Sequence, residues 1–351
     1  MKLRTDLWII LCYVLAAAIS LAMLSSIAPD RLGQQALMFG LGLGLMLYIG
    51  SQESDVYTTF APLGYLASVL LLLITFLLGA TIRGSTRWLL IGGFQLQGGE
   101  LAKPLLALAF AYYLEKYPPT TLRHLLLHLG LGAIPMFLIF KQPDLGTALV
   151  VASMWVAELF VAGVPLWLVG AGGLGFVGFL RYLPHFLHDY QLKRLESFLD
   201  PYADPTGSGY NVIQSMIAIG SGGIWGKGLG HGTQSHLAFL PERHTDFAFA
   251  SIAEELGLFG SLAILSVLGA LLLRLLRHAT TARDMRSRLL ITGIMAAVLF
   301  QTVVNMGMNL GVAPVTGVTL PLISYGGSSI LAISLMLGLV ISCSQRKQFQ
   351  V

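Results

Sequence analysis

Long apolar runs, separated by short polar segments, account for most of the chain. Ten such runs can be counted, at residues 7–28, 36–50, 60–78, 101–114, 125–140, 145–162, 165–183, 247–273, 289–310 and 327–342. A helix needs about 20 residues to cross a bilayer, so the second, fourth, fifth and tenth runs must extend into flanking polar residues or stop partway. The pattern predicts an all-α polytopic membrane protein of about ten transmembrane helices, organised as a single domain over residues 1–351.

The composition agrees with a membrane protein. Hydrophobic residues make up 55% of the chain and charged residues 11%, which is roughly half the charged share of an average soluble domain. The net charge is +4, but no basic run alternates with aromatic residues, so nothing indicates a nucleic-acid partner. The two cysteines, Cys12 and Cys343, lie in or beside apolar runs, which argues against a disulfide framework or a thiolate metal site.

The distribution of basic residues predicts the orientation of the helices. Five arginines stand between the eighth and ninth runs: Arg274, Arg277, Arg283, Arg286 and Arg288. An excess of Lys and Arg in a short loop marks the cytoplasmic side of a membrane protein. With ten spans both termini are then cytoplasmic, in agreement with Lys2, Arg4, Arg346 and Lys347. One long loop between spans seven and eight, residues 184–246, is therefore expected to be extracellular.

The end of this loop carries the densest group of polar side chains. Glu242, Arg243, His244, Thr245 and Asp246 follow one another just before the eighth run. A carboxylate at the water edge of an apolar bundle is partly desolvated, which suits a general base acting on a hydroxyl group. The alternative is structural, because Thr245 or Asp246 can cap the helix that follows.

A glycine-rich run earlier in the same loop, residues 220–230, contains Lys227. It does not fit the phosphate-binding loop of nucleotide hydrolases, because Ser221 and Gly228 stand where that pattern requires Gly and then Ser or Thr. A backbone turn with one lysine can still bind an anion, and a tight re-entrant turn explains the glycines equally well.

Charged residues also occur within the apolar runs. Glu100 and Lys103 are three residues apart at the start of the fourth run, so both project from one helical face and can pair. A charged group at bilayer depth costs about 2.5–3.5 kcal/mol, so pairing or water contact is expected. The pair is either structural or part of a polar site that positions a catalytic group. Glu158 has no partner within a turn, and is protonated, packed inside the bundle or facing a cavity.

Asp144 lies between the fifth and sixth runs, on the expected outer side. It follows a proline and precedes an apolar helix, so its carboxylate can cap the free N–H groups of that helix. Lys141 and Gln142 beside it would also suit an oligosaccharide or a pyrophosphate, and both interpretations stay open.

Many ordered motifs resemble one membrane-protein family. They occupy residues 142–148, 190–191, 198–201, 209–211, 214–215, 218–223, 226–228, 232–234, 240–247, 309–311, 314–317 and 320–329. Together they resemble the SEDS family (shape, elongation, division and sporulation), and the segment at residues 241–247 is closer to its rod-shape branch than to its division branch. The match covers nearly the whole chain.

The resemblance implies a ten-span peptidoglycan glycosyltransferase of the bacterial cytoplasmic membrane. Its substrate would be lipid II, an undecaprenyl pyrophosphate-linked disaccharide peptide. Its partners would be a class B penicillin-binding protein transpeptidase and other membrane proteins of the elongation complex. The catalytic aspartate of the family falls on Asp246, and its functionally important Glu and Lys fall on Glu100 and Lys103. The family usually has Gln-Pro-Ser-Glu before that span, whereas Gly98 and Gly99 here predict a looser turn.

A mechanism follows from the chemistry and the resemblance together. Asp246 takes the proton of the acceptor GlcNAc 4-hydroxyl, which attacks the donor MurNAc C1 with inversion and expels undecaprenyl pyrophosphate. The leaving group needs little acid help, but it needs positive charge, from Arg194, Lys227, Arg243 or a divalent cation such as Mg²⁺ or Mn²⁺. Ser324, in the last motif, is a supporting candidate, and no metal ligand can be named.

Two alternatives belong to other classes of protein. A lipid II flippase would also have ten spans and buried charges, but would need polar groups along a path across the bilayer, whereas the polar residues here gather on one side. A scaffold that only recruits cell-wall proteins would tolerate Asp246→Ala, because anchoring needs no base.

Overall fold

The computed structural model describes residues 6–82, 85–92, 94–180, 189–237 and 239–344. The basic residues nearest the two ends of the chain, which entered the orientation argument, lie outside these ranges. So do residues 181–188, where the seventh predicted span ends and the extracellular loop begins.

Ten main helices form the bundle within the described residues. They are α1 (Leu7–Ile27), α2 (Pro29–Ser51), α4 (Ala61–Leu78), α5 (Gly98–Lys116), α6 (Leu122–Lys141), α7 (Leu145–Val161), α8 (Leu166–Leu180), α12 (Ala248–Thr281), α13 (Met285–Asn309) and α14 (Gly327–Ser344). In the same part of the chain, seven are long and apolar enough to cross a membrane on their own. The prediction of about ten transmembrane helices is confirmed, and the short runs do extend into polar residues, as where α2 begins at Pro29.

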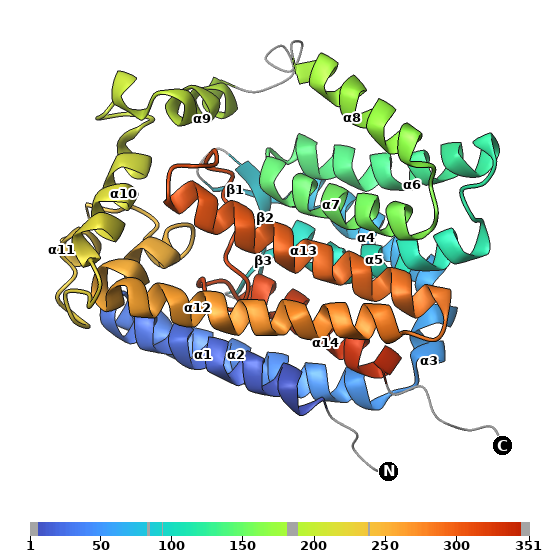
Figure 1. Ribbon diagram of the computed structural model, residues 1–351, viewed down its shortest axis with the longest axis horizontal. Coiled ribbons are helices and arrows are strands. Elements are labelled where there is room, and N and C mark those ends of the chain that lie inside the picture. The colour runs from blue at the N-terminus through green and yellow to red at the C-terminus, as the bar shows by residue number, and fades with distance from the viewer. Residues whose placement is uncertain (1–5, 83–84, 93, 181–188, 238, 345–351) are drawn as a thin grey trace.

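The helices run roughly alongside one another between two ends of the bundle (Figure 1). At one end α1 begins beside the last turns of α12. Asp6 caps α1 there and bonds to Arg274 Nε at 2.8 Å and to His278 Nε2 at 2.5 Å. Burial alone would raise the pKa of Asp6, but these two partners lower it to about 2. The short α3 (Ser54–Thr59) and the α12–α13 connection lie at this same end, which we call the arginine end (Figure 1).

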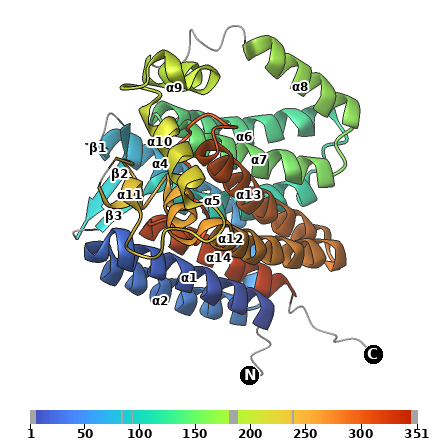
Figure 2. The same cartoon turned by 60° about the vertical axis from the view of Figure 1, so that its left-hand side comes forward.

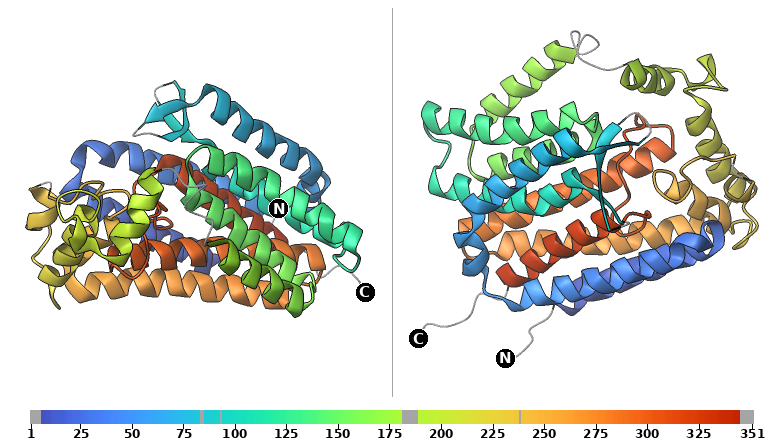
Figure 3. Two further views of the ribbon diagram at one scale, coloured as in Figure 1. Left: turned by 90° about the horizontal axis from the view of Figure 1, so that it is seen from above. Right: turned by 180° about the vertical axis from the view of Figure 1, so that it is seen from behind.

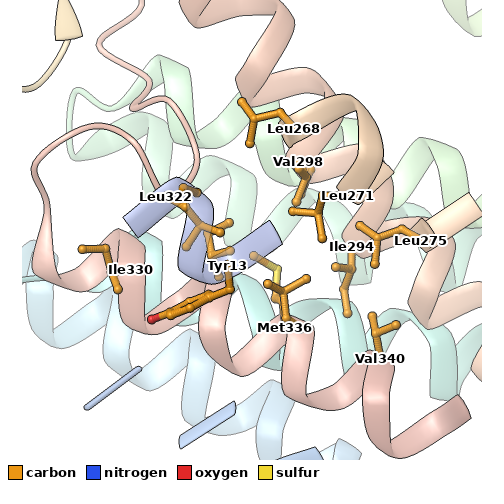
Figure 4. Close-up of a cluster of buried hydrophobic side chains, with 14 of the residues drawn as sticks. Tyr13, Leu268, Leu271, Leu275, Ile294, Val298, Leu322, Ile330, Met336 and Val340 are labelled. Atoms are coloured by element: carbon orange, nitrogen blue, oxygen red, sulfur yellow. The ribbon is translucent and has the colours of Figure 1, made fainter. Parts of the chain in front are cut away.

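The core lies where α1, α12, α13 and α14 meet (Figure 4). Small residues let α2 and α14 approach closely, as glycine commonly does between membrane helices. A Cβ atom at Gly338 would lie 3.0 Å from the carbonyl oxygen of Met46, and one at Gly50 would lie 2.8 Å from Ile341 Cγ2. Substitution of either glycine would therefore push the two helices apart.

A three-stranded antiparallel sheet joins α4 to α5, and the all-α prediction did not include it. Its strands are β1 (Ala80–Ile82), β2 (Ser85–Ile91) and β3 (Phe94–Gln97), in the order β1-β2-β3. It lies toward the end opposite the arginine end (Figures 2 and 3). The backbone N–H of Gln97 donates to Ser328 Oγ at 3.0 Å, which ties the sheet to the first turn of α14. The sheet therefore fixes where α5 starts.

The chain between α8 and α12 is structured where it is described. It contains α9 (Asp189–Leu199), the 3₁₀ turn at Pro201–Ala203, α10 (Tyr210–Gly222) and α11 (Thr233–His236). These elements gather at the end of the bundle away from the arginine end (Figure 1). This segment corresponds to the single long loop that the sequence predicts between spans seven and eight.

The glycine-rich run forms hydrogen bonds with backbone groups of α12 where that helix is interrupted. Gly257 interrupts that helix with φ = 62° and ψ = −153°. The N–H of Lys227 donates to Glu254 O at 3.0 Å, and the N–H of Gly228 donates to Glu255 O at 2.9 Å. Because these N–H groups bind carbonyls that the break releases, the run serves as a tight turn packed into a broken helix.

Gly226→Ala is expected to lower the free energy of unfolding by more than about 2 kcal/mol. Gly226 has φ = 77°, and a methyl group there would overlap the carbonyl oxygen of Glu255, which adds steric overlap to backbone strain. Gly220→Ala is the matched control, since Gly220 is helical with open space at its Cβ position and alanine favours helix. Thermal unfolding of both variants in detergent checks the prediction, and equal melting temperatures would contradict it.

Candidate functional site

The backbone of the turn before α12 is fixed by hydrogen bonds from the C-terminal part of the chain. The carbonyl of His244 accepts from the N–H of Tyr325 at 2.8 Å, and the carbonyl of Thr245 accepts from Ser324 Oγ at 2.6 Å. The carbonyl of Asp246 accepts from two carboxamide groups, those of Asn305 and Asn309, each at 3.0 Å. Three successive carbonyls are therefore held from outside the turn.

Other residues of the turn make contacts within the turn and with the end of α1. Glu242 has φ = 52°, a left-handed conformation that is strained for a residue with a side chain. Thr245 Oγ1 donates to Glu242 Oε2 at 3.0 Å, while Arg243 Nε donates to the carbonyl of Ile27 at 3.3 Å, where α1 ends. Strain held in place by surrounding contacts is a common feature of functional turns.

The carboxylate of Asp246 lies near a cation from the segment between α8 and α12. A Cβ atom at Gly317 would be 3.7 Å from Asp246 Oδ2 and 3.8 Å from Arg194 Nη1, so both side chains approach this glycine closely. Arg194 comes from α9 and also donates to the carbonyl of Val315 at 3.2 Å. The structure thus brings together a partly exposed carboxylate and a guanidinium group that the sequence had placed some fifty residues apart.

Asp144 directly precedes α7, whose first turn packs against the segment that contains Gly317. A Cβ atom at Gly146, in the first turn of α7, would contact Val318 Cγ2 at 2.6 Å. Asp144 caps α7 through the N–H of Thr147 at 3.2 Å, which confirms the capping interpretation. Its carboxylate is nearly inaccessible and also accepts from Gln97 Nε2 at 2.6 Å.

Asp144 also forms an ion pair with Arg87 of β2, with Nη1 and Oδ1 3.3 Å apart. Arg87 did not stand out in the sequence, because an arginine in the connection between two apolar runs carries no signal of its own. The sheet brings it to this carboxylate. Asp144 therefore ties the sheet to α7 in addition to capping the helix.

Glu100 and Lys103 form the predicted pair on α5. Lys103 Nζ lies 2.6 Å from Glu100 Oε2, and both side chains are buried. The angles do not satisfy a hydrogen bond, so the contact is best described as an ion pair. The preceding glycines are packed rather than loose: Gly98 faces Thr75, and a Cβ atom at Gly99 would lie 3.0 Å from Thr147 Cγ2. The expectation of a looser turn is therefore wrong, because Thr75 of α4 and Thr147 of α7 pack against its two glycines.

Two of the basic candidate residues, Lys227 and Lys141, contact other parts of the protein. Lys227 pairs with Glu254 at 3.0 Å and donates to Thr233 Oγ1 at 2.8 Å. Glu254 is fully buried and organises this part of the loop. Lys141 is exposed, with its ammonium group 5.6 Å from the centre of the Phe137 ring. Within the part of the chain that the structure describes, neither lysine bonds to the turn that carries Asp246.

The model of the FtsW, RodA and SpoVE cell cycle proteins matches residues 2–348. The chain belongs to this family. The peptidoglycan glycosyltransferase MrdB of Escherichia coli K12 is 41% identical over 314 residues, covering 89% of this chain and 84% of that protein.

Two solved structures are similar to this FtsW/RodA/SpoVE protein over their full length. One belongs to a peptidoglycan synthase complex that coordinates polymerization and crosslinking, with 38% identity, a TM-score of 0.85 and coverage of 99% of this chain and 100% of that chain. The other is the rod shape determining protein RodA of Thermus thermophilus, with 32% identity, a TM-score of 0.74 and coverage of 100% and 99%. The resemblance to the SEDS family is confirmed, and the chain is an integral membrane protein.

The two asparagines that hold Asp246 in this family member were not among the predicted site residues. Asn305 and Asn309 are four residues apart on α13 and fully buried. The signal was present in the sequence, because two carboxamides at helical spacing within an apolar run must share one face and need partners. Asn309 was noted only as the first residue of the motif at residues 309–311.

Clustered metal ligands do not occur among the described residues, where no group of three or more His, Cys, Asp or Glu side chains converges. Mg²⁺ is often held by one or two carboxylates together with substrate phosphates. Asp246 could supply such a carboxylate, with the remaining ligands coming from a pyrophosphate and water.

His244 makes a pH-dependent contribution to the free energy of unfolding of this protein. Burial lowers the pKa of this imidazole below 6.5; Glu242 and Asp30 oppose the shift, while Arg31 and Arg243 reinforce it. As the pH falls through 6.5, the unfolded chain takes up this proton before the folded protein does, so stability is lost. His244→Gln should therefore lose less thermal stability than wild type between pH 7.5 and 5.5. An identical loss in both proteins would contradict the assignment.

Glu158 is packed inside the bundle, which was one of the three possibilities that the sequence left open. It is fully buried on α7 and neither oxygen has a hydrogen-bond partner. A methyl group at Gly293 of α13 would overlap its Oε1 atom. Because an unsatisfied buried polar group costs about 1–3 kcal/mol, Glu158→Leu is expected to raise the free energy of unfolding by a similar amount and to leave activity unchanged. A loss of activity in a well-folded Glu158→Leu protein would show that the carboxyl has a function.

Proposed function

We propose that this protein is a peptidoglycan glycosyltransferase that polymerises lipid II at the outer face of the bacterial cytoplasmic membrane. The observation that carries the proposal is the approach of the Asp246 carboxylate and the Arg194 guanidinium group to the same glycine, Gly317, with Asp246 on a turn whose carbonyls are fixed. A fixed carboxylate next to a cation suits a reaction in which a proton is removed and a phosphate leaves.

Asp246 acts as the general base. Its carboxylate accepts the proton of the acceptor GlcNAc 4-hydroxyl while that oxygen forms a bond to the donor MurNAc C1. The bond between C1 and the pyrophosphate oxygen breaks on the opposite face, so the configuration inverts and undecaprenyl pyrophosphate leaves with the electron pair. The carboxyl group then returns its proton to water. A single carboxylate suffices because pyrophosphate leaves without protonation, unlike the alcohol that glycosidases must expel.

Positive charge near the leaving group comes from Arg194 in this scheme. Its guanidinium group is close enough to Asp246 to act on the same substrate. Arg243 is anchored to α1 and Lys227 to Glu254, so these two cations are placed to support the loop. A divalent cation bound with the substrate would supply further charge stabilisation.

Glu100, Lys103 and Asp144 support the site indirectly, through packing contacts. Gly99 packs against Thr147, and α7 packs against the segment that contains Gly317. These successive contacts connect the ion pair to the neighbourhood of Asp246. We assign the three charged residues to the shape and polarity of the substrate site.

A class B penicillin-binding protein is the proposed partner, together with other membrane proteins of the elongation complex. The similar synthase complex, which joins polymerization to crosslinking, supports this assignment. The proposed orientation has both termini in the cytoplasm, because the five arginines lie at the end of the bundle from which α1 starts. The turn with Asp246 then faces outward.

Incubation of the purified protein and its transpeptidase partner with lipid II tests the proposal. Strands that migrate as a ladder on a gel and are digested by a muramidase are the expected product. A flippase would instead move labelled lipid II across vesicles without forming strands, and a scaffold would do neither. Either of those outcomes would overturn the proposed function.

A further inference from the structure

The side chain of Asn309, the last residue of α13, takes part in the hydrogen bonds of the first turn of α12. In a regular helix the N–H of Ala250 would bond to the carbonyl four residues earlier, which is that of Asp246. Here the carboxamide of Asn309 stands between these two groups. Its Nδ2 donates to Asp246 O at 3.0 Å, and its Oδ1 accepts from the N–H of Ala250 at 3.1 Å. One side chain from α13 thus replaces a backbone bond in the first turn.

Asn305 connects the same carbonyl to the segment on the other side of the site. Its Nδ2 donates to Asp246 O at 3.0 Å and to the carbonyl of Val318 at 2.8 Å. Val318 directly follows Gly317, the residue against which Asp246 and Arg194 meet. The two carboxamides therefore hold the turn and the segment facing it in one fixed relation.

We infer that Asn305 and Asn309 are positioning residues for Asp246, an inference that rests on the proposed function. Both are fully buried, and Asn309 Nδ2 also donates to the carbonyl of Asn305 at 2.8 Å, so neither side chain has freedom to rotate. Opening the first turn sets the direction in which the Asp246 side chain leaves the backbone. A displacement of about 1 Å in a reacting group can cost about 10²-fold in rate.

Asn309→Asp and Asn309→Ser separate this role from a general effect on folding. Aspartate keeps an acceptor for Ala250 but loses the amide donor toward Asp246, whereas serine is smaller and keeps a hydroxyl donor. We expect Asn309→Asp to lower kcat for strand synthesis by about 10²-fold with little change in KM for lipid II. Asn309→Ser should retain more activity. Gln301→Leu is the matched control, since Gln301 is also buried on α13 but its carboxamide has no hydrogen-bond partner.

A double-mutant cycle with Asp246→Asn decides whether the asparagine acts through the aspartate. If it does, Asn309→Asp lowers the small residual rate of Asp246→Asn by less than about 3-fold, because the base it positions is already gone. Equal losses in both backgrounds, or wild-type kcat in a folded Asn309→Asp protein, would overturn the inference and leave the proposed function intact. Wild-type activity of Asp246→Asn would instead overturn the proposed function.

Discussion

Asp246→Asn is expected to lower the rate of glycan-strand synthesis by about 10²–10⁴-fold, the usual contribution of a positioned general base. Asparagine has nearly the same size and leaves the backbone carbonyl of residue 246 available to Asn305 and Asn309. The fold should therefore survive, but the side chain can no longer accept the proton of the acceptor hydroxyl. Rates from a lipid II gel assay, with melting temperatures measured in parallel, check this expectation.

Asp204→Asn is the matched control for that substitution. Asp204 is an exposed aspartate of the same segment between α8 and α12, and its carboxylate accepts hydrogen bonds from the N–H groups of Gly207 and Ser208 within its own turn. Its replacement should leave the polymerisation rate within about 2-fold of wild type. Comparable losses from both substitutions would mean that the assay reports general damage to the segment, and the role of Asp246 would have no support.

Lys103→Met is expected to destabilise the protein by about 3–5 kcal/mol and to abolish activity with it. Methionine resembles the lysine stem in size, but it leaves Glu100 as a buried carboxylate without its counter-ion, and removing one partner of a buried pair is costly. Lys103 is fully buried and Glu100 nearly so. A melting curve of the detergent-solubilised variant shows the loss.

The double variant Glu100→Gln with Lys103→Met identifies the cause of that loss. With no charge left to bury, it should recover much of the melting temperature of wild type. Its activity shows separately whether the charges are needed for polymerisation. A single Lys103→Met variant as stable as wild type would contradict the buried ion pair.

The ten helices and the ion pair on α5 could be predicted from the sequence because both depend on local patterns. An apolar run long enough to cross a bilayer admits few structures other than a helix. Residues three apart on a helix share a face, as Glu100 and Lys103 do. The polar turn before α12 was found for a similar reason, since charges are rare within membrane helices and gather where there is water or a partner.

The remaining features depend on contacts between distant segments. The sheet at residues 80–97 is stabilised partly by Ser328, which lies far along the chain. Lys227 was proposed as a phosphate ligand, but Glu254 is its partner in the structure. No local pattern predicts that residues 223–228 bind the backbone groups at the break in α12, or that Asn309 bridges Asp246 and Ala250. Such contacts require the three-dimensional arrangement of the bundle.

The most direct test of the account counts the two products of the proposed reaction in one assay. Purified protein is reconstituted in lipid nanodiscs with its partner, crosslinking is blocked, and lipid II is supplied with labels on both the lipid and the sugar. The account predicts one undecaprenyl pyrophosphate released for each new glycosidic bond in wild type, and formation of both products slowed by about 10²–10⁴-fold in Asp246→Asn. Two results would contradict the account. One is glycosidic bond formation at the wild-type rate in Asp246→Asn, and the other is a folded wild-type complex that forms no glycosidic bonds from lipid II.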